Sequence, residues 1–161
     1  MKTLILIRHA KSSWDDPYLD DFERPLNQRG TRDLPKMAAR FRSKYVDVNY
    51  FIASPANRAL TTAKAFAEEK ENSLMVDKSL YHASYRNMIS ILRQVADKLD
   101  QIALVGHNPG LTDLCNHLLR DEFIDNIPTT GIVVLSLPVT SWNEITAKSA
   151  SLIEFDYPKK S

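Results

Sequence analysis

The stretch TLILIRH (residues 3–9) decides the fold class of this chain. Residues 3–7 form an uninterrupted run of apolar and β-branched residues, which is typical of a strand buried on both faces. Arg8 and His9 follow directly, so two polar side chains stand where this strand would end. A strand buried on both faces needs cover on each side, and this indicates a sheet between two layers of helices.

The same pattern occurs twice more along the chain. Residues 50–53 form a second apolar run that ends at Ser54-Pro55, and residues 102–105 form a third that ends at Gly106. Apolar residues spaced three or four apart then predict amphipathic helices. Their expected apolar faces are Leu34, Met37, Ala38, Phe41 and Tyr45; Ala56, Ala59, Leu60, Ala63 and Phe66; Met88, Ile91, Leu92, Val95 and Leu99; and Leu111, Leu114, Cys115 and Leu118.

The boundaries of these elements complete the predicted architecture. Ser54 and Asn108 each precede a proline, which predicts that both residues cap helices. Residues 132–137 and 144–155 are two expected late strands with no helix between them, so one of them should be antiparallel at an edge. We therefore predict an α/β three-layer sandwich with a mostly parallel central sheet flanked by helices, in a single domain over residues 1–161.

Composition narrows the classes of function. The chain is 43% hydrophobic and 25% charged, and its formal net charge of +1 indicates neither nucleic acid nor an anionic membrane as a partner. Its one cysteine, Cys115, lies on an expected apolar helix face and allows neither an internal disulfide nor a structural zinc site. No apolar stretch approaches the roughly 20 residues of a membrane span. We expect a cytoplasmic protein.

Three of the predicted strands end in groups that bind anions. Arg8 and His9 follow the first strand, Arg58 lies one helical turn after the second, and His107 follows the third. Ligands of open parallel sheets bind beyond the carboxyl ends of the strands, so these side chains should share one crevice. Helix N-termini and guanidinium groups both favour phosphate oxygens. The sequence therefore predicts a phosphate pocket that uses no metal or other cofactor.

The same residues predict a chemistry. A neutral imidazole is a competent nucleophile, so His9 could attack phosphorus while Arg8, Arg58 and His107 stabilise the charge on the equatorial oxygens. A metal site is the competing interpretation, but the four histidines show no HxH or HExxH spacing. The acidic run Asp15-Asp16 with Asp20-Asp21 lacks the glycine and the final glutamate of a calcium loop, and we interpret it as a solvated loop at the rim.

Four segments resemble the motifs of the histidine phosphatase superfamily. They occur in the family's order and extend from residue 3 to about residue 135, and the start RHAKSSW and the run GHNPG are most similar to SixA-like phosphohistidine phosphatases. The segments are RHAKS (8–12), similar to an RHG motif with Ala10 for Gly; PLNQRG (25–30), similar to PLT…G; SPANRA with TA (54–63), similar to SPxxR…TA; and GHNP (106–109), similar to the second histidine motif.

The resemblance implies a phosphoglycerate mutase-like fold and a role for each matching residue. His9 would be the nucleophile, Arg8 and Arg58 would bind phosphate, and His107 would bind or stabilise the transferring phosphoryl group. Further contributors to phosphate binding would be Ser12, Lys11, Asn108 and Thr130. The implied partner is a protein that carries phosphohistidine.

One position departs from the wider family and leaves the substrate open. His82, in Leu80-Tyr81-His82, stands where many members carry a general-acid glutamate. Phosphohistidine leaves as an imidazole, which needs less help from an acid than an alkoxide does. The alternatives are a small-molecule phosphomonoesterase, in which His82 or Asp77 donates a proton, and a phosphate-binding module without turnover. Retention of His9, Arg8, Arg58 and His107 gives no support to the last alternative.

Overall fold

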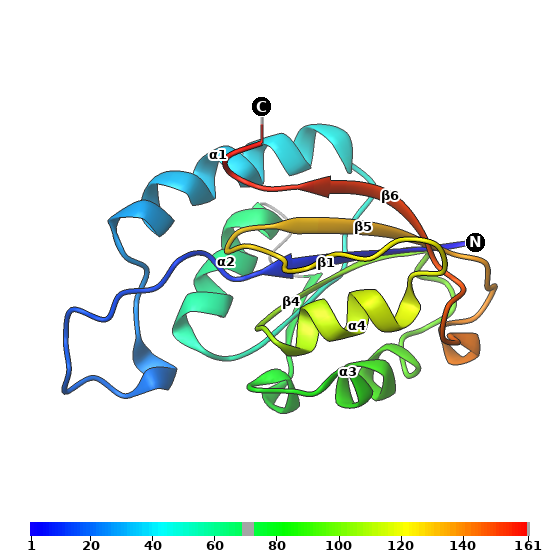
Figure 1. The fold of residues 1–161 in the computed structure, drawn as a ribbon, viewed down its shortest axis with the longest axis horizontal. Coiled ribbons are helices and arrows are strands. Elements are labelled where there is room, and N and C mark those ends of the chain that lie inside the picture. The colour runs from blue at the N-terminus through cyan, green and yellow to red at the C-terminus, as the bar shows by residue number, and fades with distance from the viewer. Residues whose placement is uncertain (69–72, 161) are drawn as a thin grey trace.

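The computed structural model describes residues 1–68 and 73–160, which form one six-stranded sheet with helices on both faces (Figure 1). The strands are β1 (Lys2–Arg8), β2 (Phe51–Ala53), β3 (Leu74–Val76), β4 (Gln101–Gly106), β5 (Ile132–Leu137) and β6 (Ser151–Asp156). The α-helices are α1 (Gln28–Lys44), α2 (Asn57–Ala67), α3 (Tyr85–Leu92) and α4 (Gly110–Leu118), and the short 3-10 helices include η1 (Asp21–Glu23), η3 (Lys78–Leu80) and η4 (Trp142–Glu144). None of the helices within these ranges has the length and apolarity needed to cross a bilayer.

The strand order β3-β2-β4-β1-β5-β6 confirms the mostly parallel sheet. β1, β2, β3 and β4 pair in parallel, whereas β5 is antiparallel to both of its neighbours. The expected antiparallel strand therefore exists, but it lies one position in from the edge, and β6 is the edge strand. The expected late strand 144–155 is also shorter than predicted: β6 begins only at Ser151, because residues 145–149 form a loop with a turn in which Lys148 has a φ of 54°.

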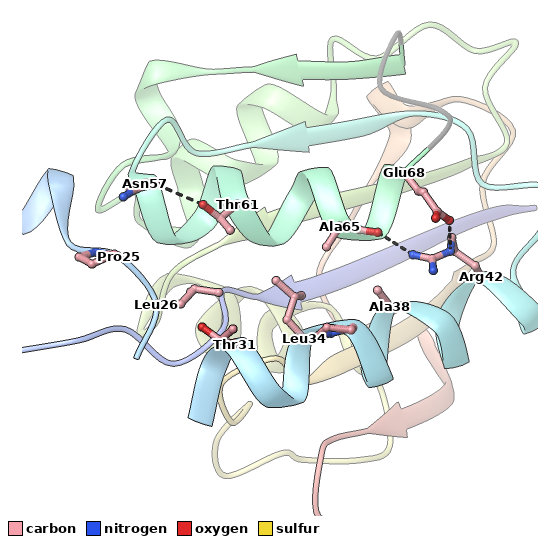
Figure 2. Close-up of a pocket in the computed structure, with 11 residues that line it drawn as sticks. Pro25, Leu26, Thr31, Leu34, Ala38, Arg42, Asn57, Thr61, Ala65 and Glu68 are labelled. Atoms are coloured by element: carbon pink, nitrogen blue, oxygen red, sulfur yellow. Dashed lines mark hydrogen bonds and ion pairs between the residues drawn. The ribbon is translucent and has the colours of Figure 1, made fainter. Parts of the chain in front are cut away.

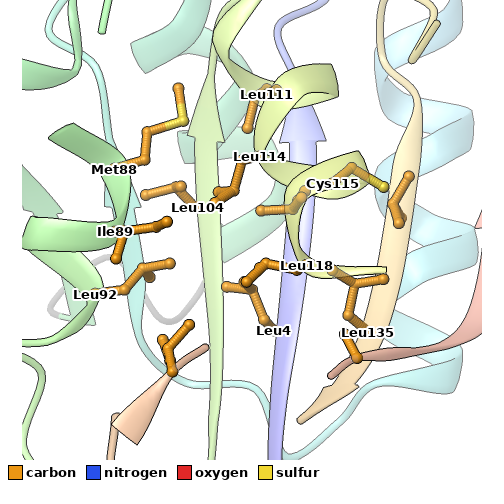
Figure 3. Packing of buried hydrophobic residues seen from close by; sticks show 14 of the residues in the cluster. Leu4, Met88, Ile89, Leu92, Leu104, Leu111, Leu114, Cys115, Leu118 and Leu135 are labelled. Atoms are coloured by element: carbon orange, nitrogen blue, oxygen red, sulfur yellow. The ribbon is translucent and has the colours of Figure 1, made fainter. Parts of the chain in front are cut away.

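Side-chain alternation along the central strands creates two cores. Leu4 and Leu6 of β1 face α3 and α4, where they join Leu104, Met88 and the apolar face of α4 (Figure 3). Ile5 and Ile7 point to the opposite face and pack with α1 and α2. Both faces of the sheet are thus covered, as the uninterrupted apolar run of residues 3–7 predicts. The three-layer arrangement is confirmed.

Helix boundaries differ from the predicted ones for a reason that concerns the site. α2 begins at Asn57, and Ser54 caps no helix, because its hydroxyl bonds the ring of His107 instead. α4 begins at Gly110, and Asn108 accepts hydrogen bonds from the first turn of the helix. α3 ends at Leu92, short of the expected end near residue 99. Residues before the two prolines are thereby left in loops that line the carboxyl edge of the sheet.

The topology places a crevice between β1 and β4. These two strands pair in parallel with Arg8 opposite Gly106. α1, which follows β1, and α4, which follows β4, lie on opposite faces of the sheet (Figure 1). The two chains therefore diverge just beyond the paired strand ends, and such a switch point is where open α/β sheets bind ligands.

Candidate active site

Arg8, His9 and His107 form the floor of the site, at the carboxyl ends of β1 and β4. The backbone N–H of His9 donates to the carbonyl of Gly106 at 3.1 Å, which continues the pairing of the two strands by one residue. The rings of His9 and His107 lie 5.3 Å apart between centroids. They are only 7% and 3% exposed. The sheet thus brings together the two histidines that the sequence places about a hundred residues apart; we call these three residues the pocket floor.

A backbone contact determines which nitrogen of His9 is free to react. Nδ1 of His9 lies 2.7 Å from the carbonyl oxygen of Ala10. Because a carbonyl oxygen only accepts, Nδ1 carries the proton and Nε2 keeps its lone pair. The N–H of Ala10 in turn donates to Thr62 Oγ1 at 2.8 Å, and Thr62 donates to the carbonyl of Arg58 at 2.7 Å. The end of β1 is therefore anchored to α2.

Two atoms of the pocket floor lack a hydrogen-bond partner. In the described part of the chain, the buried side-chain atoms without one are Nε of Arg8 and Nδ1 of His107. The other ring nitrogen of His107, Nε2, lies 2.7 Å from Ser54 Oγ. When the serine hydroxyl donates, Nδ1 of His107 bears the proton and needs an acceptor. Buried donors without acceptors are costly, and the oxygens of a bound phosphate would satisfy both.

Burial holds both histidines of the pocket floor in the neutral form. Loss of solvent lowers the pKa of His9 from 6.5 to about 4, with further lowering by the charges of Arg58, Arg8 and Arg24. Loss of solvent also lowers the pKa of His107, to about 3. A nucleophile must be unprotonated, so a cationic surrounding that stabilises neutral His9 favours attack on phosphorus and attracts the phosphate as well.

Arg58 joins the pocket floor to a second set of residues. Its guanidinium is buried, and both terminal nitrogens bond Asp21: Nη1 the backbone carbonyl at 2.7 Å and Nη2 the carboxylate at 3.1 Å. The same carboxylate accepts from the hydroxyl of Tyr81 at 2.5 Å and lies 3.5 Å from Nε2 of His82. We call Asp21, Tyr81 and His82 the rim. Contacts to Tyr81, Arg24 and Arg58 hold the pKa of Asp21 well below its usual range against the opposing effect of burial.

A third arginine, Arg24, belongs to the site and was not predicted. Its side chain is buried; Nη1 donates to Asp21 at 2.8 Å, Nε to the carbonyl of Ser13 at 2.9 Å, and Nη2 to the hydroxyl of Ser12. The hydroxyl of Ser12, an expected phosphate ligand, is therefore engaged by this arginine. Asp21 is likewise no solvated loop residue, because its carboxylate binds two arginines. The available signal was an arginine directly before the segment PLNQRG.

Three further residues were predicted to contribute to phosphate binding, and in this structure they contact the backbone of neighbouring segments. Lys11 is exposed, and its carbonyl packs so tightly on the first turn of α1 that a Cβ on Gly30 would lie 2.2 Å from it. Asn108 donates to the carbonyl of Ile127 at 3.0 Å. Thr130 has a φ of 60°, and its N–H lies 3.1 Å from the carbonyls of both Arg8 and His9.

The two predicted proton donors differ in position. The ring of His82 lies 5.9 Å from that of His107, and its backbone has a φ of 56°, which few non-glycine residues adopt. Its side chain is 61% exposed, so it can reach solvent and the pocket mouth. Asp77 instead accepts from the N–H and hydroxyl of Ser79 as the cap of η3. His82 is therefore the better placed of the two.

A separate cavity lies between α1 and α2 (Figure 2). It measures about 550 Å³, and Arg8, His9, Arg58 and His107 are absent from its lining. An ion pair of 2.7 Å between Arg42 and Glu68 marks its far end. The concentration of charge and of reactive groups lies at the strand ends instead, so we place the chemistry there. Within residues 1–68 and 73–160, no group of three or more His, Cys, Asp or Glu side chains is arranged to hold a metal ion.

At the switch point of this α/β sheet, arginines surround a neutral histidine. This arrangement is typical of an anion-binding active site. The family model of the histidine phosphatase superfamily (branch 1) matches residues 4–98, more than half of the chain. This chain belongs to that superfamily.

The relatives agree with this assignment in sequence and fold. An uncharacterised protein of Mycobacterium tuberculosis is 26% identical over 162 residues, covering 95% of this chain and 100% of its own. A candidate SixA phosphohistidine phosphatase of Nakamurella multipartitia matches with a TM-score of 0.83 and 21% identity over 99% of this chain and 97% of its own. A phosphoserine phosphatase mutant of Entamoeba histolytica matches with a TM-score of 0.70 and 15% identity over 99% and 98%. The structural matches confirm the phosphoglycerate mutase-like fold.

Proposed function

We propose that this protein is a cytoplasmic phosphatase that hydrolyses phosphohistidine on a partner protein through a covalent intermediate on His9. The observation that carries the proposal is the hydrogen bond from Nδ1 of His9 to the carbonyl of Ala10, which leaves Nε2 as a fixed, unprotonated nucleophile. The family, the charges of Arg8 and Arg58 that act on His9, and the His107 ring 5.3 Å from the His9 ring support it.

The first step transfers the phosphoryl group to the enzyme. Nε2 of His9 attacks phosphorus in line, a bond from Nε2 to phosphorus forms, and the bond to the leaving nitrogen breaks. The electron pair stays on the leaving imidazole, which departs as a neutral ring because its other nitrogen already carries a proton. Arg8, Arg58 and Nδ1–H of His107 stabilise the charge on the equatorial oxygens, and such preorganised donors are usually the largest single contribution to catalysis.

The second step returns the enzyme to its starting state. Water attacks phosphorus from the side that the leaving group has vacated, and the bond between phosphorus and Nε2 breaks. The electron pair returns to Nε2, while the proton lost by water stays with the released inorganic phosphate. The hydrogen bond from Nδ1 to Ala10 keeps the ring in one orientation through both steps.

The identity of the leaving group favours phosphohistidine. An imidazole leaves without a strong acid, whereas an alkoxide requires a proton. The rim carboxylate cannot supply one, because Asp21 stays ionised among Arg24, Arg58 and Tyr81. The structural relatives include a protein histidine phosphatase SixA in complex with tungstate, an anion of phosphate-like shape.

A second candidate function rests on His82. Its ring lies beside Tyr81 and within 5.9 Å of the His107 ring, close enough to the pocket mouth to protonate an alkoxide leaving group. The enzyme would then be a small-molecule phosphomonoesterase on the same fold.

Substrate comparison with the wild-type protein separates the two candidates. We would measure kcat/KM for free phosphohistidine and for a panel of sugar phosphates, in the presence of EDTA. We expect a clear preference for phosphohistidine that survives chelation, because the arginines supply the positive charge. A strong preference for sugar phosphates would favour the second candidate. Activity that EDTA abolishes and a single metal restores would contradict the metal-independent mechanism.

A further inference from the structure

The segment between β1 and α1 extends beyond the carboxyl edge of the sheet (Figure 1). Residues 14–20 of this segment, which we call the arm, are exposed from end to end. Trp14 is 76% exposed and Tyr18 is 97% exposed. Large aromatic side chains exposed on a segment that contributes nothing to either core are typical of surfaces that bind another molecule.

The arm is joined directly to the proposed active site. The ring of Trp14 covers the guanidinium of Arg24 at 3.3 Å from the ring centroid. Arg24 bonds Ser12 on one side and Asp21 on the other, and Asp21 holds Arg58. A molecule that contacts the arm would therefore lie next to a phosphate held by Arg58.

The charge of the arm is opposite to that of the pocket. It carries Asp15, Asp16 and Asp20, and none of the ion pairs among residues 1–68 and 73–160 involves these carboxylates. The carboxylate of Asp16 accepts the N–H of Tyr18, at 3.0 Å. Carboxylates beside exposed aromatic rings favour cationic side chains, which gain both Coulomb attraction and a cation–π contact.

We propose that the arm is a docking surface for the polypeptide around the phosphorylated side chain of a partner protein, and that this polypeptide carries Arg or Lys near the phosphorylated residue. The proposal rests on the proposed function. It adds to it a preference for sequence context, because one ligand must present a phosphate to the pocket and a cation to the arm at the same time. A polypeptide meets this requirement, whereas a small phosphomonoester does not.

The test uses three substrates with the same scissile bond. They are free phosphohistidine, a peptide with a central phosphohistidine flanked by arginines, and the same peptide with serines in place of the arginines. Because the leaving group does not change, differences among the three report contacts outside the pocket. We expect wild-type kcat/KM to be highest on the arginine peptide, and the advantage to shrink as salt is raised.

The variants are chosen to leave the pocket intact. Tyr18→Ser removes a ring that packs on nothing, and Asp15→Asn with Asp20→Asn removes charge without changing shape. Each variant should lower kcat/KM on the arginine peptide by about twofold to fivefold, the size of an exposed cation–π or ion-pair contact. Values for free phosphohistidine should stay unchanged. Trp14 is left in place because its ring covers Arg24.

Phe123→Ser is the matched control. Phe123 is 73% exposed, and it follows the C-terminal end of α4. Its neighbour Ile124 bonds Asn116 near that end of the helix, whereas His107 precedes the N-terminal end. This variant should behave as the wild type on all three substrates.

The outcomes separate this proposal from the proposed function. Equal wild-type values for the three substrates, or arm variants with unchanged preference, would overturn the docking surface while phosphohistidine hydrolysis stands. A wild type that hydrolyses none of the three would overturn the proposed function and this proposal with it. A wild-type dimer that Tyr18→Ser dissociates, with no change in substrate preference, would assign the arm to self-association and also overturn the proposal.

Discussion

The pocket floor and the rim are held in place by different kinds of contact. In the pocket floor, backbone groups of paired strands carry Arg8 and His9, and the ring of His9 bonds a backbone carbonyl. In the rim, one carboxylate, that of Asp21, connects Arg58 of α2 to Tyr81 and His82, which follow η3. His9 and His107 of the pocket floor are almost fully buried and Arg8 is partly buried, whereas the side chain of Asp21 is 34% exposed.

This difference indicates that the pocket floor and the rim have different roles. Strand ends hold the proposed nucleophile and the groups proposed to stabilise charge, and such groups must not move during the reaction. The rim orients Arg58 and can adjust to the leaving group, because its contacts are made by side chains in loops. Variants of groups that touch the phosphate should therefore cost most, and the effect should decrease outward through the rim.

Among variants that keep His9, the largest effect is expected at Arg58, where pocket and rim meet. Arg58→Ala should lower kcat/KM by about 10² to 10⁴-fold, because two charge-assisted hydrogen bonds of roughly 1.5–3 kcal/mol each are lost. Arg58→Lys should recover only part of this, since an ammonium cannot bond Asp21 and two phosphate oxygens in one plane. Steady-state kinetics on phosphohistidine checks both variants. A lysine variant with wild-type kcat and KM would show that geometry is not what Arg58 supplies.

For Asp21→Asn we expect a smaller loss of kcat, together with a change in inhibition by inorganic phosphate. Loss of the carboxylate should loosen the orientation of Arg58 and lower kcat by about tenfold. The pocket also loses one negative charge, so inorganic phosphate should inhibit the variant at lower concentration than the wild type. The variant Asp21→Glu keeps the charge, so inorganic phosphate should inhibit it at the same concentration as the wild type. Wild-type kcat with weaker phosphate inhibition would contradict the assigned role.

The smallest effect on phosphohistidine is expected at the outer rim. His82→Ala should keep most of its kcat/KM on this substrate and lose more on sugar phosphates, since general acid catalysis contributes about 10² to 10⁴-fold where it is needed. The ratio of variant to wild-type kcat/KM is compared between the two substrates, and the difference reports the effect of the leaving group. Equal, large losses on both substrates would place His82 in the common pocket.

Titration of the histidines tests the electrostatic description of the pocket floor. The pKa of His9 is lowered from 6.5 to about 4 and that of His107 to about 3. Nitrogen NMR should therefore show both rings neutral as the pH falls from 8 to 5. The unfolded chain binds these protons near pH 6.5, so the free energy of unfolding should decrease as the pH falls from 6.5 towards 4. Midpoints near 6.5 in the folded protein would contradict this description.

The pocket floor was largely predictable from sequence, whereas only His82 of the rim was identified as a candidate. Arg8, His9 and His107 follow apolar runs that predict buried strands, and parallel strand ends meet at one edge. Asp21, Arg24 and Tyr81 lie in or at the ends of the short 3-10 helices η1 and η3, where contacts depend on how these segments fold over the sheet. No periodicity indicates that a carboxylate within an acidic run will bind two arginines.

The misplaced elements have equally local causes. Ser54 before Pro55 matches a helix cap, but a serine hydroxyl binds a buried imidazole equally well, and only the paired strands bring His107 within reach. β3 is as short as β2 but was missed, because it lies at the edge of the sheet, its residues are not buried, and no amphipathic helix follows it directly. β6 was predicted too long because the predicted run also covers residues 145–149, where a turn with a positive φ at Lys148 precedes the strand.

The most direct test of the central claim is to trap the phosphorylated enzyme. The protein would be mixed with phosphohistidine or an aryl phosphate, quenched in alkali, where phosphohistidine is stable, and digested for mass spectrometry. We predict one phosphoryl group on the peptide that contains His9, and none on a folded His9→Ala variant, which should be inactive. A phosphoryl group on His107 or His82 instead, or a folded His9→Ala protein that retains more than a few per cent of wild-type activity, would contradict the assignment of His9 as nucleophile.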